Sequence, residues 1–421
     1  MDALKFVRAC QEQNPIDLYD VALGVFTTDL PEELYENYDV MMTIELLCDA
    51  LYEEKEFSKV EELVQVLRLH QPELYQDALF TLLPDLIYYY LFKGDEEKID
   101  YYMRELAIAP EEDFLLFVHL LDVLDAYGYT EMMNQIVTDV LTTDTHLDEE
   151  DQELLESYLV AVEPFTDDAD LQKVRHDFLE RAPFWYIPSI TAENIIDAMT
   201  DYFDRNYPEE NKMPDKLILE EESFRDYITT LLDLEFLDTY EYAASVLWGS
   251  VYLMDMLGAN STLTAEETAH NLQIIEKMKA FFFVNIPWDG YWRLKFLYMW
   301  EKPWSIEKDT FDAERRLVEH NLLVKPKNII NHSIIDVFGP SARHLPYAKY
   351  LEDEQSAFEK MISKENSHDF GADHKKDSMF PFFNYLSGEV DDEFKPMPSG
   401  FCNTQKGKGG NECCSRDVNP V

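Results

Sequence analysis

The sequence predicts an all-α protein that begins with helical-hairpin repeats and continues into a second helical domain and a flexible tail. Its 421 residues are 46% hydrophobic and 14% aromatic, which is enough to bury more than one core. Only 13 residues are glycine, whereas sheets with tight hairpins usually need more glycine for their turns. Apolar residues in the first third of the chain recur at i, i+3, i+4 and i+7, the spacing of one helix face.

The helical spacing is clearest in three segments that begin at Ala50, Tyr89 and Leu124. Each predicts the end of one helix, a short turn and a second helix. The apolar residues of the three second helices are Val60, Leu63, Val64 and Leu67; Ile99, Tyr102, Met103 and Leu106; and Met133, Ile136, Val137 and Val140.

The three sets are offset by 39 and then 34 residues, and Glu56, Gly94 and Gly128 are expected at one place in the turn. A period of this length, made of paired helices, is typical of a solenoid. We therefore predict a repeat domain at residues 1–160. The alternative is an irregular helical bundle whose self-similarity arose by chance.

The first of these units, Ile44 to Pro72, resembles a tetratricopeptide repeat. The resemblance rests on Leu47, Tyr52, Phe57 in the turn, and the closing Pro72. The family usually has small residues where this chain has Cys48, Val60 and Leu67, so wider, HEAT-like packing is expected. The resemblance implies a concave groove that binds a peptide or a partner protein, and it implies no catalysis.

A second helical domain is expected at residues 161–365. Thr264 followed by Glu267 predicts a capped helix start. The stretch from Phe281 to Trp304 holds four of the six tryptophans, with rings at Trp288, Trp292, Phe296 and Met299/Trp300 at helical spacing. This pattern predicts either the interior of the domain or an aromatic groove for a ligand.

Charge restricts the partners that the chain can have. The formal net charge is −50, with 85 acidic and 35 basic residues. Such a field repels phosphate backbones and attracts basic proteins, so the charge disfavours nucleic acid as a partner and favours a basic protein. The alternatives are that acidity serves solubility or a saline habitat, or mimics nucleic acid. The basic residues Lys325, Lys327, Arg343 and Lys349 are expected to pair with the protein's own carboxylates or to mark a site for an acidic ligand.

Neither a secretion signal nor a membrane span is evident. The longest apolar runs, from Leu79 and from Tyr242, are shorter than the ~18 residues that a spanning helix needs. Cys10 and Cys48 lie in helical-looking segments, far from the other three cysteines, so a disulfide scaffold is not expected. The sequence predicts a cytoplasmic protein without a membrane partner.

Histidines and aspartates of the C-terminal third suggest a metal-dependent hydrolase as one alternative function. They are His332, His344, the pair His368–Asp369 and the pair Asp373–His374. Their spacing does not match a known metal motif, and HExxH, GxSxG, GxxxxGK[ST] and GxGxxG are all missing from the sequence. We therefore assign no catalytic and no cofactor-binding residue.

The chain ends in a loop-rich tail, residues 366–421, that contains "GGNECCS". This end resembles a degenerate SEC-C motif, a short zinc-binding tail of many bacterial proteins, which would imply a bacterial source. The candidate metal ligands are Cys402, Cys413 and Cys414, although no residue separates the last two and no second pair follows. Structural zinc takes four ligands, so the tail is interpreted as a zinc site, an eroded motif or an unrelated tail.

Taken together, these features predict a non-enzymatic protein–protein interaction scaffold or adaptor. The two alternatives are the metal-dependent hydrolase and an acidic mimic of nucleic acid that binds a basic protein.

Overall fold

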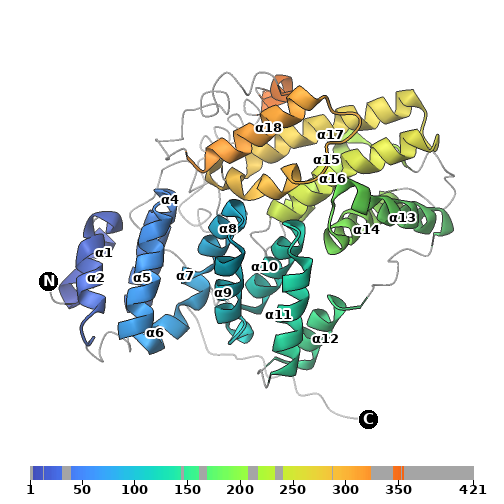
Figure 1. Ribbon diagram of the computed structural model, residues 1–421. Helices are drawn as coiled ribbons and strands as arrows, with labels where there is room; N and C mark the ends of the chain where they lie inside the picture. The colour runs from blue at the N-terminus through green and yellow to red at the C-terminus, as the bar shows by residue number, and fades with distance from the viewer. Residues whose placement is uncertain are drawn as a thin grey trace, which may run out of the picture. The chain divides into compact units, whose positions relative to one another are not determined.

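The computed structural model describes residues 3–12, 14–30, 39–143, 147–160, 168–206, 217–232, 240–286, 288–323, 345–351 and 353–354. All of them belong to one compact unit, Met1–Asn366; the second unit is Ser367–Val421. Every regular element in these ranges is a helix, so the all-α prediction is confirmed for the described part of the chain (Figure 1).

The helices of the N-terminal part are α1 (Ala3–Glu12), η1 (Pro15–Leu18), α2 (Tyr19–Phe26), α4 (Asp39–Glu53), α5 (Phe57–His70), α6 (Pro72–Asp77), α7 (Leu79–Leu82), α8 (Pro84–Lys93), α9 (Glu96–Leu106), η2 (Pro110–Asp113), α10 (Phe114–Ala126), α11 (Thr130–Thr142) and α12 (Glu149–Ser157). Those that follow are α13 (Ala169–Arg181), η3 (Ala182–Trp185), α14 (Ser189–Asn206), α15 (Glu221–Leu232), α16 (Tyr240–Ala259), α17 (Ala265–Asn285), η5 (Trp288–Tyr298) and α18 (Lys308–Asn321). The symbol η marks a 3₁₀ helix.

Three helix pairs, α4/α5, α8/α9 and α10/α11, are joined by turns with one backbone conformation. Each turn has one residue in the left-handed region, with φ of 58° at Lys55, 71° at Gly94 and 85° at Gly128. These positions are offset by 39 and 34 residues, the predicted shifts. The prediction of Glu56 for the first turn was wrong by one residue, because Glu56 has an ordinary φ of −90°.

The hydrogen bonds of the three turns also coincide. The residue after the left-handed one donates its N–H back to the carbonyl five positions earlier: Glu56 to Leu51 (2.8 Å), Asp95 to Tyr90 (3.1 Å) and Tyr129 to Leu124 (2.9 Å). This bond satisfies a carbonyl group that the helix end would otherwise leave without a partner. The first helix of each pair therefore ends with the same combination of a left-handed residue and a backbone hydrogen bond.

The second helices of the pairs bury the stripes that their sequences predicted. All twelve stripe residues, from Val60 to Val140, are buried. Side chains also link each second helix to the next: Arg68 of α5 pairs with Glu105 of α9 (3.3 Å), and Arg104 of α9 pairs with Asp139 of α11 (2.6 Å). The three pairs stand side by side, α4/α5 to α10/α11 (Figure 1). We call them the helix-pair array.

After residue 168, α14, α15, α17 and η5 pack against α16, which is buried along almost its whole length, while α13 packs on α14 and α18 on η5. Its Gly249 allows close approach to α14, since a Cβ there would lie 2.6 Å from the side chain of Ile195. The capped start predicted for α17 is present: Thr264 accepts a hydrogen bond from the backbone N–H of Glu267 (3.3 Å), whose carboxylate accepts one in return. No described helix is long and apolar enough to cross a membrane.

Contacts cross the boundary predicted near residue 160. The buried carboxylate of Asp125 in α10 accepts hydrogen bonds from the backbone N–H and the hydroxyl of Thr191, at 2.7 and 2.8 Å, at the start of α14. A carboxylate at this place satisfies the free N–H groups of the helix end. The boundary itself stays a prediction.

The aromatic stretch is largely buried, in agreement with the interpretation that it forms the interior of the domain. Trp292, Phe296 and Trp300 are buried, whereas Met299 is exposed. Residues 288–298 form the 3₁₀ helix η5 rather than the α-helix that the spacing suggested. The side chain of Trp288 lies outside the described part of the structure.

Candidate protein-binding surface

The helix-pair array has two edges, which differ in what covers them. The turn edge consists of the three turns, residues 54–56, 93–95 and 127–129. The distal edge consists of the C-terminal ends of α5, α9 and α11, with the segments 71–77 and 107–113 that follow α5 and α9.

The turn edge is covered by η5 from the same chain. The ring of Trp292 lies against Phe57, directly after the first turn, and Phe92, just before the second, with ring centres 5.6 and 6.0 Å apart. The hydroxyl of Tyr127, at the third turn, donates to the carbonyl of Arg293 (2.9 Å). One short segment therefore contacts all three pairs, although Lys93, Gly94 and Asp95 of the second turn stay exposed.

A buried polar network lies behind η5. Arg293 pairs with Asp85 of α8, and its guanidinium stacks over the ring of Tyr88 at 4.4 Å. The hydroxyl of Tyr88 hydrogen-bonds His119 of α10 (2.5 Å), whose Nε2 lies 3.8 Å from a carboxylate oxygen of Glu241 in α16. Burial, with a smaller contribution from Arg293, lowers the pKa of His119 to about 3, so its ring is neutral. The network joins helices of both halves of the unit.

A shallow groove of about 620 Å³ opens beside the second turn, lined by Ser58, Glu61, Tyr89, Tyr90, Lys93, Gly94, Asp95, Glu96 and Glu97. The carboxylate of Glu61 is already engaged, by Lys98 and by the hydroxyls of Tyr90 (2.8 Å) and Tyr102 (3.2 Å). Burial raises the pKa of Glu61, but these hydrogen bonds outweigh it and lower the pKa overall. The groove combines the rings of Tyr89 and Tyr90 with charged side chains, and the carboxylate of Glu61 in its lining is engaged by other residues of the array.

The distal edge exposes large apolar side chains. Leu69, at the end of α5, is 76% exposed, and Ile108, just after α9, is 62% exposed. These two residues are 39 apart, so they occupy the same position in successive helix pairs. Between them Arg68 pairs with Glu105 and lies over the ring of Tyr101 at 5.3 Å.

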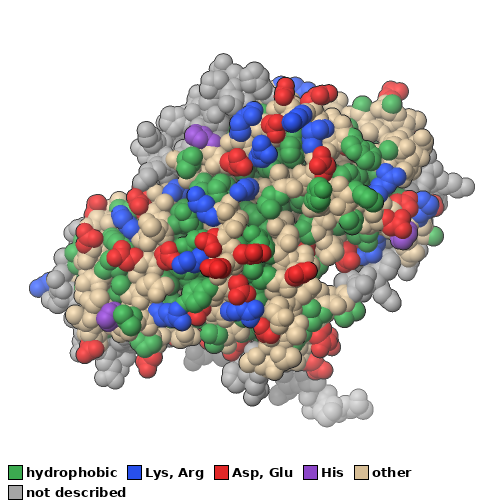
Figure 2. Space-filling model, viewed as in Figure 1, with side chains coloured by type: hydrophobic (Ala, Val, Ile, Leu, Met, Phe, Trp, Pro, Cys, Tyr) green, Lys and Arg blue, Asp and Glu red, His purple; other side chains and the backbone are tan. Residues whose placement is uncertain are grey.

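Charge on the distal edge is unbalanced. Its arginines are engaged by carboxylates of the array, as the ion pairs above show. Exposed carboxylates at Glu73, Asp77 and Glu112 form no ion pair with any residue in the described ranges. In the space-filling view, acidic, basic and apolar side chains are interspersed on this face of the molecule (Figure 2). The edge itself therefore combines apolar contact area with negative charge that no ion pair among the described residues neutralises.

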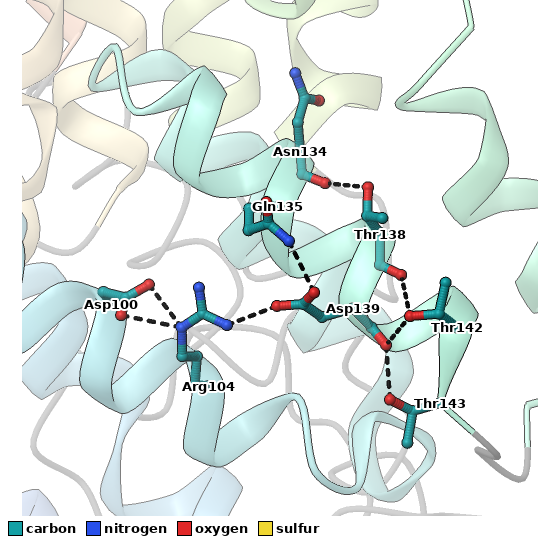
Figure 3. Close-up of polar contacts among 8 residues, drawn as sticks. All are labelled: Asp100, Arg104, Asn134, Gln135, Thr138, Asp139, Thr142 and Thr143. Carbon is teal, nitrogen blue, oxygen red and sulfur yellow. Dashed lines mark hydrogen bonds and ion pairs between the residues drawn. The ribbon is translucent and has the colours of Figure 1, made fainter.

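The third pair ends differently. At the position equivalent to Leu69 and Ile108 stands Thr142, whose hydroxyl donates to the carbonyl of Thr138 (2.9 Å), while Thr143 donates to the carbonyl of Asp139 (2.7 Å). These hydroxyls satisfy carbonyl groups of the last turn of α11, and the Asp139 carboxylate is held by Arg104 and Gln135 (Figure 3). The apolar part of the distal edge thus belongs to the first two pairs.

The metal ligands proposed from the sequence lie outside the described residues. These are Cys402, Cys413 and Cys414, together with His332, His344, His368, Asp369, Asp373 and His374. The described ranges contain no group of three or more histidine, cysteine, aspartate or glutamate side chains that could hold a metal ion. The zinc site and the hydrolase alternative stay predictions.

The remaining candidates from the sequence are placed in part. Lys349, from the basic strip, lies 3.9 Å from the carboxylate of Glu276, which is the self-pairing that one hypothesis expected. The other basic residues of the strip lie outside the described ranges. Cys10 and Cys48 are buried free thiols, and burial raises both pKa values, that of Cys10 to about 11. Neither is suited to be a reactive thiolate.

The chain matches no protein-family model, and no curated protein or solved structure is significantly similar to it. The tetratricopeptide-like and SEC-C-like resemblances accordingly stay predictions. The exposed pair Leu69 and Ile108 was missed at the sequence level, although the 39-residue offset that relates the two was already visible.

Proposed function

We propose that this protein is a non-enzymatic interaction scaffold whose helix-pair array binds a partner protein. The observation behind the proposal is that three helix pairs share one turn conformation, one buried stripe and side-chain links between successive second helices. Arrays of this kind present extended surfaces on which a partner can contact several pairs at once.

The division between the two edges supports the same proposal. The turn edge is used within the chain, where η5 contacts all three pairs. A rigid array loses little conformational entropy when it binds, which favours affinity. The distal edge then offers the partner a surface that is already in place.

Photo-crosslinking in the full chain tests the proposal. Benzoylphenylalanine placed at exposed Gln65 of α5 or Gln135 of α11 samples the array, and the same group at exposed Gln273 of α17 is the matched control. We expect a defined protein from the native lysate to crosslink from the array positions, and not to an unrelated bait of similar negative charge. Crosslinks that form only from Gln273, or equally with the acidic bait, would contradict the proposal.

A further inference from the structure

Leu69 and Ile108 are the most exposed large apolar side chains of the helix-pair array, and both lie at the distal edge. Single exposed apolar side chains are common and need no explanation. Leu69 and Ile108 are instead related by the repeat, and the ion pair of Arg68 with Glu105 brings the two helix ends together. Neighbouring packed helices have axes about 8–10 Å apart.

That spacing matches a helix of a partner protein. Seven residues of an α-helix span about 10.5 Å, so apolar residues at i and i+7 on one helix are separated by about the distance between two packed helices. An amphipathic helix laid across the ends of α5 and α9 can therefore contact Leu69 with one turn and Ile108 two turns later. This is the usual mode in which a helix with an apolar stripe docks on a helical surface.

The charge of the distal edge indicates which kind of partner helix it can bind. The exposed carboxylates of Glu73, Asp77 and Glu112 follow the apolar pair closely in sequence, and the arginines of this edge are engaged by carboxylates of the array. A second copy of this chain, with a formal charge of −50, would bring like charges against this edge. Lysine and arginine side chains beside the apolar stripe of the partner would instead be attracted.

Resting on the proposed scaffold function, we propose that the distal edge binds a basic amphipathic helix of a partner protein. Leu69 and Ile108 contact its apolar stripe, and Glu73, Asp77 and Glu112 pair with its lysines and arginines.

The test uses the full chain and a synthetic probe. The probe is a fluorescein-labelled 14-residue peptide of leucine and lysine at amphipathic helical spacing, and its control is a peptide of the same composition with the stripe scrambled. Fluorescence anisotropy measures both affinities at low and moderate salt. We expect the amphipathic peptide to bind at least about fivefold more tightly than the scrambled one, because only its stripe meets the apolar pair.

Matched variants locate the site. Leu69→Ser with Ile108→Ser removes the apolar pair, and Phe184→Ser with Leu323→Ser removes residues that are 79% and 74% exposed outside the array. All four side chains are exposed, so both double variants should keep the wild-type circular dichroism spectrum and unfolding midpoint. We expect the first double variant to weaken peptide binding at least about fivefold and the second to change it less than about twofold.

Several results would overturn the inference. They are absence of peptide binding to the wild-type chain, equal binding of the two peptides, or equal weakening in the two double variants. Hydrogen exchange gives an independent location, since bound peptide should protect amides in residues 68–77 and 105–115; protection only elsewhere also contradicts the inference. If native partners crosslink from the array but tolerate Leu69→Ser with Ile108→Ser, this inference fails and the scaffold function stands.

Discussion

Replacing Gly128 by alanine should destabilise the protein, while the same replacement at Gly24 should stabilise it. Gly128 has φ of +85° in the third turn, and a Cβ there would meet no atom within 4 Å. Gly24 lies exposed within α2, and a Cβ there also meets nothing within 4 Å. Because neither alanine creates a clash, the backbone conformation decides the sign of each effect.

The magnitude follows from the two conformations. A left-handed backbone costs an L-residue about 1–2 kcal/mol, whereas alanine in a helix interior is favoured over glycine by about 0.5–1 kcal/mol. Both replacements lower the conformational entropy of the unfolded chain to the same extent. This stabilising contribution is therefore equal in the two variants and cancels when their free energies of unfolding are compared. The difference between their free energies of unfolding should therefore be about 1–2 kcal/mol, with Gly128→Ala the less stable.

Urea unfolding followed by far-ultraviolet circular dichroism measures this difference. The midpoint should move down for Gly128→Ala and up for Gly24→Ala, with the denaturant slope unchanged in both. A Gly128→Ala variant as stable as Gly24→Ala would refute the argument that the turn requires a left-handed residue.

Three further predictions concern the core, the titration of the array and the tail. Trp292→Ala should lower the free energy of unfolding by about 3–5 kcal/mol because the buried ring leaves a cavity between the three turns, whereas Trp304→Ala, at a position 59% exposed, should cost less than about 1 kcal/mol; urea unfolding compares them. Burial raises the pKa of Asp122 from 3.8 to about 7, so the folded state holds this proton more tightly and stability should fall as pH rises between these values. Asp122→Asn should flatten that dependence. A steeper pH dependence of stability in Asp122→Asn would contradict the raised pKa of Asp122. Hydrogen bonds from Arg104 lower the pKa of Asp139, so the contribution of Asp139 to stability has the opposite sign and is lost as pH falls below the pKa of the unfolded state. Elemental analysis of the purified chain should find less than one zinc per molecule, because the three tail cysteines supply fewer than the four ligands of a structural site; stoichiometric zinc would contradict this.

Much of the array could be predicted from the sequence, because a helix stripe depends on local spacing. The residues from Val60 to Val140 that were assigned to the second helices are the ones that the structure buries. The turn residue was misplaced at Glu56 because glycine marks the left-handed position in the other two turns and lysine occupies it in the first. A non-glycine residue with positive φ is uncommon, so Lys55 gave no local indication of its conformation.

The aromatic stretch shows where local patterns are insufficient. Its composition indicated burial, and Trp292 is buried, but the spacing suggested an α-helix and the structure has the 3₁₀ helix η5. Its place over the turn edge depends on contacts such as that of Tyr127 with Arg293, which are 166 residues apart. Periodicity within a window of one helix contains no information about such a contact.

The candidate surface could likewise be predicted only in part from the sequence. The offset between Leu69 and Ile108 can be counted in the sequence, but each is an unremarkable apolar residue at a helix end. Their importance depends on exposure, and exposure depends on which edge of the array η5 covers.

The sequence by itself determined that the described chain is helical and which face of each paired helix is apolar, because both follow from backbone geometry repeated every 3.6 residues. Only the tertiary structure showed that η5 packs against the turn edge, and that Leu69 and Ile108 at the distal edge are exposed. Packing between segments far apart in the chain determines which edge is covered. The net free energy of that packing depends on how the surfaces of the segments fit together, and no local pattern of residues specifies it.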